Sequence, residues 1–178
     1  MVKIKGEILD ANEKENKLDF NVRIITQSKI DPERFYIGRN TIGVTVIEYN
    51  SGKWRRVITY KSGQGSVTGI SEVENGDLIF STDFSNNIFR VPFNDTIPVL
   101  YGTEKGVPDS PVKAISEIGN EIIITTGKGL YKYVKTNDSL IPCDEMTGGY
   151  SAGKESFVLL RDQDSDLWVA FKDPARYS

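Results

Sequence analysis

Apolar residues occur along this chain in short segments that are separated by turn-forming residues. Between residues 67 and 101 the turns are Asn75-Gly76, Ser85-Asn86-Asn87 and Asn94-Asp95-Thr96. Asn-Gly favours a hairpin because both residues tolerate the positive φ of a type I′ turn. The pattern predicts antiparallel strands joined by hairpins. The strands expected here are residues 67–73, 77–82, 87–91 and 97–101.

This four-strand pattern repeats along the sequence. Repeats begin near Asn21, Ser66, Pro111 and Ser156. One apolar position recurs at steps of 43, 44 and 45 residues, and a second recurs every 45 residues. Four short strands in about 44 residues are typical of a β-propeller blade. The sequence therefore predicts an all-β propeller with about four repeats of 43–45 residues in four-stranded antiparallel blades. The two recurring positions are Phe35, Leu78, Ile122 and Leu167, and Val22, Val67, Val112 and Phe157.

The second strand of each repeat is apolar at consecutive positions, as in Leu78-Ile79-Phe80 and Ile122-Ile123-Ile124. Continuous apolar strands are buried on both faces. In a propeller the neighbouring blades supply that cover, so we expect the repeats to stack face to face. By the same argument Trp168, in the fourth second strand, is expected in the core of a blade.

The repeat register divides the chain into blades of a single domain, residues 1–178. Full blades are expected at 21–65, 66–110 and 111–155, with half-blades at 1–10 and 156–178. Residues 2–5 and 8–9 align with third and fourth strands, whereas 156–178 supply only first and second strands. The two halves complement each other, which allows a four-bladed ring, an eight-bladed ring of two chains, or a fragment of a longer propeller. Residues 11–17 are expected to form a charged loop.

The third repeat carries Gly106-Val107-Pro108, a strand from Val112, the run from Ile122 to Thr126, and Gly129-Leu130-Tyr131. The fourth adds Arg161-Asp162 and Leu167-Trp168-Val169. These motifs resemble the two-component regulator propeller repeat, which reads Gly-Leu-Pro, a valine strand, a Glu-Asp turn, Leu-Trp-Ile-Gly-Thr, and Gly-Leu with a tyrosine. The first two repeats have Phe35-Tyr36 and Leu78-Ile79 in place of Leu-Trp.

The resemblance implies a function as well as a fold. Repeats of this family build large propellers in sensor proteins, commonly the periplasmic domains of histidine kinases that respond to glycans. It implies a ligand-sensing domain in signal transduction, a periplasmic or extracytoplasmic location, and carbohydrate recognition.

Charge and composition narrow the classes of partner. The net charge is −3 and basic residues are scattered, so we expect no nucleic-acid partner. The densest basic group, Lys53-Trp54-Arg55-Arg56, fits an exposed outer strand. No apolar run approaches the roughly 20 residues that span a bilayer, so direct membrane insertion is not expected.

The chain has no histidine, which excludes the usual serine and cysteine triads and ordinary zinc sites. The single cysteine, Cys143, is expected to be a small packed residue. The segment from Gly148 to Lys154 has phosphate-loop spacing, but Glu155 stands where a hydroxyl is needed and a strand follows. We therefore expect no catalytic residue of these kinds and no cofactor.

A weak calcium candidate lies in the last repeat. Asp162, Asp164 and Asp166 alternate as in a calcium-binding loop, and Asp173 occupies the twelfth place. Leu167 replaces the sixth-position glycine. The same acids serve as turn formers, so the structural interpretation is favoured and no metal site is assigned.

The longer loops all leave the predicted blades at one end, where repeat folds usually bind their ligands. The candidate ligand-binding residues at this end are Arg39, Tyr101, Asp109 and Tyr150. The first hypothesis is a non-catalytic binding module for a carbohydrate or protein ligand, acting as a sensor or a protein-interaction scaffold. The alternatives are a propeller-type carbohydrate hydrolase or lyase using carboxylates, and a structural subunit of a multi-chain assembly or homo-oligomer.

Overall fold

A computed structural model describes residues 20–84, 87–150, 152–162 and 166–172. These residues form fourteen strands and two short 3-10 helices, with no α-helix among them. The strands are β1 (Val22–Gln27), β2 (Arg34–Arg39), β3 (Ile42–Asn50), β4 (Lys53–Gly63), β5 (Val67–Glu72), β6 (Leu78–Thr82), β7 (Ile88–Val91), β8 (Val99–Tyr101), β9 (Val112–Ile118), β10 (Glu121–Thr126), β11 (Gly129–Val134), β12 (Ser139–Pro142), β13 (Ser156–Arg161) and β14 (Leu167–Phe171). The 3-10 helices are η2 (Thr103–Lys105) and η3 (Asp144–Thr147).

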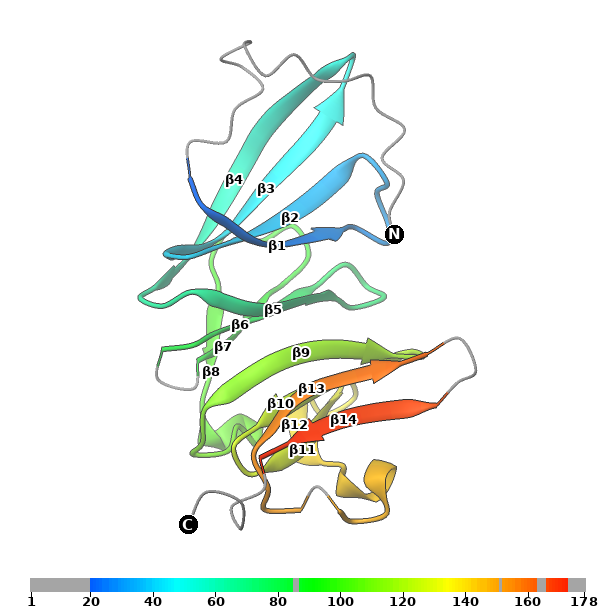
Figure 1. The fold of residues 1–178 in the computed structure, drawn as a ribbon. Helices are drawn as coiled ribbons and strands as arrows, with labels where there is room; N and C mark the ends of the chain where they lie inside the picture. Colours follow the sequence, from blue (N-terminus) through cyan, green and yellow to red (C-terminus); the bar gives the residue numbers. More distant parts are fainter. Residues whose placement is uncertain (1–19, 85–86, 151, 163–165, 173–178) are drawn as a thin grey trace.

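The strands form three antiparallel sheets of four strands and one of two strands. Each sheet follows chain order: β1–β4, β5–β8, β9–β12 and β13–β14. The sheets are stacked one after another, and the first strand of each lies beside the first strand of the next (Figure 1). The prediction of an all-β propeller fold with four-stranded antiparallel blades is confirmed.

The hydrophobic core lies between the sheets and is divided into three clusters. Leu78 and Phe80 of β6 face the first sheet, whereas Ile79 between them faces the third. Ile122 and Ile124 of β10 likewise face the second sheet, and Ile123 faces β14. The expectation that consecutive apolar residues are covered on both faces is confirmed.

Two departures from the expected strands have local causes. β8 begins at Val99 rather than at residue 97, because Pro98 has no N–H to donate to the sheet. β4 extends to Gly63, whereas the sequence predicts a loop between blades from Lys61 to Gly65. The expectations for residues 1–10 and 11–17 and for Asp164 lie outside the described residues.

The inner strands of the second and third sheets approach each other closely at Gly69. A Cβ atom at this position would lie 2.4 Å from the backbone nitrogen of Ile115 and 2.6 Å from its Cβ. Backbone cannot move aside as a side chain can, so only glycine fits here.

Gly69→Ala is therefore expected to lower the free energy of unfolding by about 1–3 kcal/mol, because it overpacks this contact. Gly38→Ala is the matched comparison. Its Cβ would meet side-chain atoms of Val67 and Ile70 at 2.9–3.2 Å, which can adjust, so a smaller loss is expected. Urea unfolding of both variants measures the difference, and equal losses would contradict the argument.

Candidate functional site

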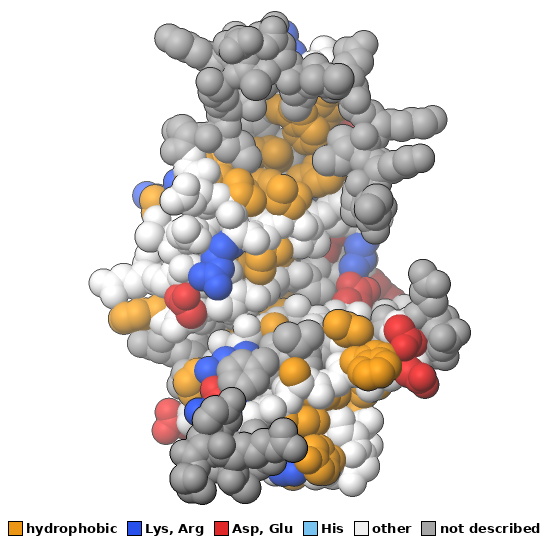
Figure 2. Space-filling view, viewed as in Figure 1, with side chains coloured by type: hydrophobic (Ala, Val, Ile, Leu, Met, Phe, Trp, Pro, Cys, Tyr) orange, Lys and Arg blue, Asp and Glu red, His pale blue; other side chains and the backbone are white. Residues whose placement is uncertain are grey.

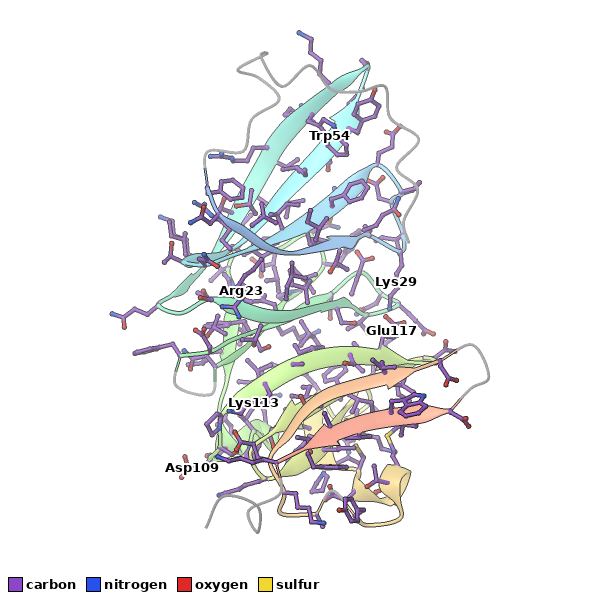
Figure 3. The ribbon with its side chains drawn as sticks, viewed as in Figure 1. Arg23, Lys29, Trp54, Asp109, Lys113 and Glu117 are labelled. Atoms are coloured by element: carbon purple, nitrogen blue, oxygen red, sulfur yellow. The ribbon has the colours of Figure 1, made fainter. Side chains whose placement is uncertain are left out.

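The topology brings the long connections to one end of the stack, which we call the loop face. It comprises the second-to-third strand turns and the connections between sheets, at residues 40–41, 64–66, 83–84, 87, 102–111, 127–128, 143–150 and 152–155. Figure 3 shows Arg23, Asp109 and Lys113 toward this end and Lys29 and Glu117 toward the opposite end.

Charged pairs join neighbouring sheets at the loop-face ends of the inner strands. At the loop face Arg23 pairs with Asp83 at 3.6 Å, and Lys113 Nζ lies 2.7 Å from Glu155. In Figure 2 hydrophobic side chains lie over the middle of this view, and charged side chains gather toward its two sides.

Tyr150 is 62% exposed at the loop face. The Lys154 ammonium lies 3.3 Å from the centroid of its ring, and the ring of Phe171 packs against it edge-on at 5.2 Å. Cation–π and edge contacts of this kind hold an exposed ring in one orientation. Tyr150 therefore presents an aromatic surface whose position is fixed by its neighbours.

Arg39 and Asp109 also lie at the loop face, but on different sheets. Arg39 ends β2, half-buried, with its guanidinium carbon 3.9 Å from the centroid of the Phe20 ring. Asp109 is exposed in the connection between β8 and β9 (Figure 3). The loop face thus carries the candidates on successive sheets, and the structure does not gather them into one pocket.

Tyr101 differs from the expectation of an accessible aromatic group, because only 3% of it is exposed. It packs in the cluster between the second and third sheets, and its hydroxyl donates to Asp138. Tyr133 Oη and Lys105 Nζ each donate to the same carboxylate at 3.0 Å, and Arg90 does so at 3.2 Å. Tyr101 thus belongs to a polar cluster that joins two sheets.

This Asp138 cluster alters the pKa values of its members. Burial and the hydrogen bond to Asp138 raise the pKa of Tyr133 to about 12 and that of Tyr101 further. Burial opposes ionisation of Asp138, but the hydrogen bonds from Tyr101, Lys105 and Tyr133 outweigh it and lower the pKa of that carboxyl. The cluster therefore holds an ionised aspartate among protonated tyrosines at neutral pH.

A second polar cluster, around Glu72 of β5, was not anticipated. Glu72 is fully buried and accepts hydrogen bonds from the Ser28 hydroxyl at 2.9 and 3.0 Å, from the Lys29 amide at 2.5 Å and from the Tyr36 hydroxyl at 2.5 Å. All three donor residues belong to the first sheet or its β1–β2 connection. Burial and the bond to Glu72 raise the pKa of Tyr36 above its ordinary value.

Lys29 extends this connection to a third sheet. Its ammonium donates to the backbone oxygen of Glu72 at 2.6 Å and lies 2.7 Å from a carboxylate oxygen of Glu117. Gln27, Glu72 and Glu117 share one repeat position, 45 residues apart. The recurrence of an acid at this position, as Glu72 and Glu117, was the signal in the sequence that could have identified the cluster.

The carboxylate of Asp162 closes the hairpin between β13 and β14. Its two oxygens accept from the Asp166 amide at 2.9 Å and from Trp168 Nε1 at 2.6 Å. A turn-forming role thus has direct geometric support, while Asp164 lies outside the described residues. Within the described ranges no group of three or more histidine, cysteine, aspartate or glutamate side chains is arranged to hold a metal ion.

Two further expectations concern buried residues. Cys143 is fully buried in the cluster between the third sheet and β14, and burial raises its pKa to about 12, as expected for a packed and unreactive thiol. Trp168 was expected in a blade core, and this is wrong for the single chain. It is 60% exposed, because among the described residues no sheet follows β13–β14.

No protein-family model matches the sequence, and no curated protein matches it at a significant level. Several solved structures match the chain. The chain superposes on the extracellular domain of a protein described as a hybrid two component system, BT4673 from B. thetaiotaomicron, with a TM-score of 0.57 and 19% identity. The match covers 85% of this chain and 19% of that domain.

Two other matches have similar scores. YCF48 from Cyanidioschyzon merolae gives a TM-score of 0.56 and 16% identity over 88% of this chain and 55% of that chain. A streptogramin B lyase gives a TM-score of 0.57 and 17% identity, over 85% of this chain and 50% of that chain. These are propeller-type folds, so the class defined here is a β-propeller, in agreement with the sequence resemblance. At this level of identity the likeness establishes the fold alone.

In the part of the chain that the structure describes, no helix is long and apolar enough to cross a membrane.

Tyr36→Phe is expected to cost about 1–3 kcal/mol of unfolding free energy, because it removes one donor from a buried carboxylate. Because folding raises the pKa of Tyr36, its contribution is present below about pH 10 and is lost as pH rises through the folded-state pKa. The wild-type chain should therefore lose stability more steeply above pH 10 than the variant. Urea unfolding from pH 7 to pH 11 measures both effects. Tyr150→Phe, which alters an exposed ring, should match the wild type, and an equal loss in both variants would contradict the assignment.

Asp138→Asn is expected to lower stability by about 1–3 kcal/mol at pH 7 through loss of the charge that four side chains contact. Asp138 has φ +48°, a conformation that asparagine also adopts, so backbone strain is not introduced. The folded-state pKa of Asp138 is lowered, so the wild-type advantage should shrink as pH falls below about 4 and be lost as pH passes through the folded-state pKa. Denaturation at pH 7 and pH 3 tests this, and the same deficit at both values would argue against it.

Proposed function

We propose that the chain is a β-propeller ligand-binding module of a signalling protein, which recognises its ligand with the loop face. The orientation of Tyr150 is the observation that carries this proposal. Its ring is largely exposed, yet Lys154 and Phe171 hold it in place. An aromatic group that is already ordered loses little conformational entropy on binding.

The chemistry at this end suits a carbohydrate or a peptide segment. An aromatic face packs against the C–H groups of a sugar ring or against apolar side chains, and carboxylates and guanidinium groups bind hydroxyls or charged groups. Asp109, in the β8–β9 connection, and Arg39, at the end of β2, offer those polar groups elsewhere on the loop face. The match to an extracellular domain of a two component system supports a sensor, and therefore a location outside the cytoplasm.

Binding without catalysis is the simplest function for this arrangement. Glu72, which is buried, and Asp138, which is partly buried, use their carboxylate oxygens in hydrogen bonds that join sheets. Neither is arranged as an acid–base pair toward the loop face. A carbohydrate hydrolase or lyase remains the second function to be separated by experiment.

The binding experiment uses the 178-residue chain against arrays of bacterial and plant glycans and of peptides, followed by titration calorimetry on any hit. Tyr150→Ala and Asp109→Ala should each weaken binding about tenfold, which corresponds to about 1.4 kcal/mol. Asn120→Ala, an exposed substitution in the β9–β10 turn at the opposite end, should bind as the wild type does.

Mass spectrometry of the recovered ligand completes this test. An intact ligand after prolonged incubation supports a binding module, and cleaved product supports the hydrolase or lyase. Saturable binding that is unchanged in both loop-face variants, or no binding to any probe, would refute a loop-face site for these ligands.

A further inference from the structure

One position in the second strand of each sheet is covered by the following sheet, except in the last. Tyr36, Ile79 and Ile123 occupy this position in the first three sheets and are 4%, 0% and 0% exposed. Each packs in the cluster shared with the next sheet along the chain. The fourth member of the series is Trp168, at 60%.

The outer surface of β13–β14 is apolar where the other sheets make their interfaces. Leu167 and Val169 point toward the third sheet, and strand alternation places Trp168 and Ala170 on the other side. Leu160, paired with Trp168 across the hairpin, is 48% exposed. The hydrogen bond to Asp162 orients the indole. We call this surface, formed by Leu160, Trp168 and Ala170, the end face.

The edge of β14 is also open within the described residues. β2, β6 and β10, its equivalents, each pair with a third strand, whereas β14 pairs with β13 only. An exposed strand edge is a ready site for pairing with another chain. The last sheet thus offers both an edge for a third strand and a face for a following sheet.

The sequence of the chain contains both missing parts in the right order. Residues 2–5 and 8–9 have the register of third and fourth strands, and the first sheet follows them along the chain. We propose that a second copy of this chain docks here: its residues 2–9 complete the β13–β14 sheet, and its first sheet covers the end face.

The geometry of a single chain does not allow the same arrangement within itself. The inner strands succeed one another as β1, β5, β9 and β13, and the first sheet lies at the opposite end of the stack from β14 (Figure 1). A first sheet cannot cover the end face of its own stack while it is separated from it by two others. A second copy supplies that sheet.

Trp168 would meet a face of the first sheet that resembles the faces covering its equivalents, Tyr36, Ile79 and Ile123. Phe35 and Ile37 hold the positions of Leu78 and Phe80, which cover Tyr36 in the next interface. Both are already shielded from solvent in the single chain. Docking therefore replaces the contacts that shield these two residues with contacts to the end face.

If each copy donates to the other, two chains close a ring of eight blades in which every blade has four strands. The chain covers 50% of the streptogramin B lyase and 55% of YCF48, so each copy contributes about the amount of one half of such a fold. The inference concerns assembly and does not depend on the ligand.

The first test is the mass in solution by light scattering across a range of concentrations. The wild-type chain should reach about twice 19.9 kDa. Trp168→Glu, which places a charge on the end face, and Ile4→Pro, which prevents strand pairing by the donated segment, should each give the mass of one chain. Ile97→Glu is the matched control, since Ile97 is 68% exposed in the connection between β7 and β8, and should remain a dimer. Far-UV circular dichroism confirms that each variant keeps its strands.

Complementation gives the sharper result. In an equimolar mixture, the Trp168→Glu chain still has an intact donated segment and the Ile4→Pro chain an intact end face, so dimers should reappear. A Trp54→Phe chain then reports on Trp168 alone, whose fluorescence should shift to shorter wavelength as dimers form.

The proposal is overturned by a single-chain mass at every concentration, which would leave the rest of a longer protein as the occupant. It is equally overturned by a larger assembly, or by a dimer that survives both substitutions.

Discussion

The whole structure depends on burying the second strand of each sheet from both sides. Leu78-Ile79-Phe80 and Ile122-Ile123-Ile124 have no polar face, so neither strand could lie at the surface of an isolated sheet. When similar sheets are stacked, each sheet buries the apolar second strand of its neighbour, and the same contact is repeated along the stack. The order of the sheets in space therefore follows their order in the chain.

Apolar burial drives the stacking of the sheets, and polar contacts set how neighbouring sheets are placed. Glu72 and Asp138 each gather donors from more than one chain segment, and each lies at a junction between sheets. Such contacts cost desolvation and are favourable only when nearly every group is paired. They fix how neighbouring sheets are placed, which leaves the loop face free to vary in sequence and to carry recognition.

The strands and their stacking were predictable because they follow from local patterns. Turn residues and apolar runs located β5, β6 and β7 to within a residue at each end. The polar clusters were not predictable in the same way, because Ser28 and Glu72 meet only after two sheets have packed. Tyr101 was misplaced for the same reason, since a tyrosine beside a loop is exposed or buried according to whether a partner such as Asp138 comes within reach. Trp168 was misplaced because pattern alone cannot say whether a following sheet is present.

Lys29 contacts both the second and the third sheet, and this has a consequence for how the array comes apart. In a simple stack each unit melts almost independently of all but its immediate neighbour. Here, detaching the first sheet would break the hydrogen bonds that Ser28, Lys29 and Tyr36 make to Glu72 and, through Lys29, the contact with the third sheet. Fraying from that side is thereby coupled to the middle of the array, so the first three sheets should open as one cooperative unit.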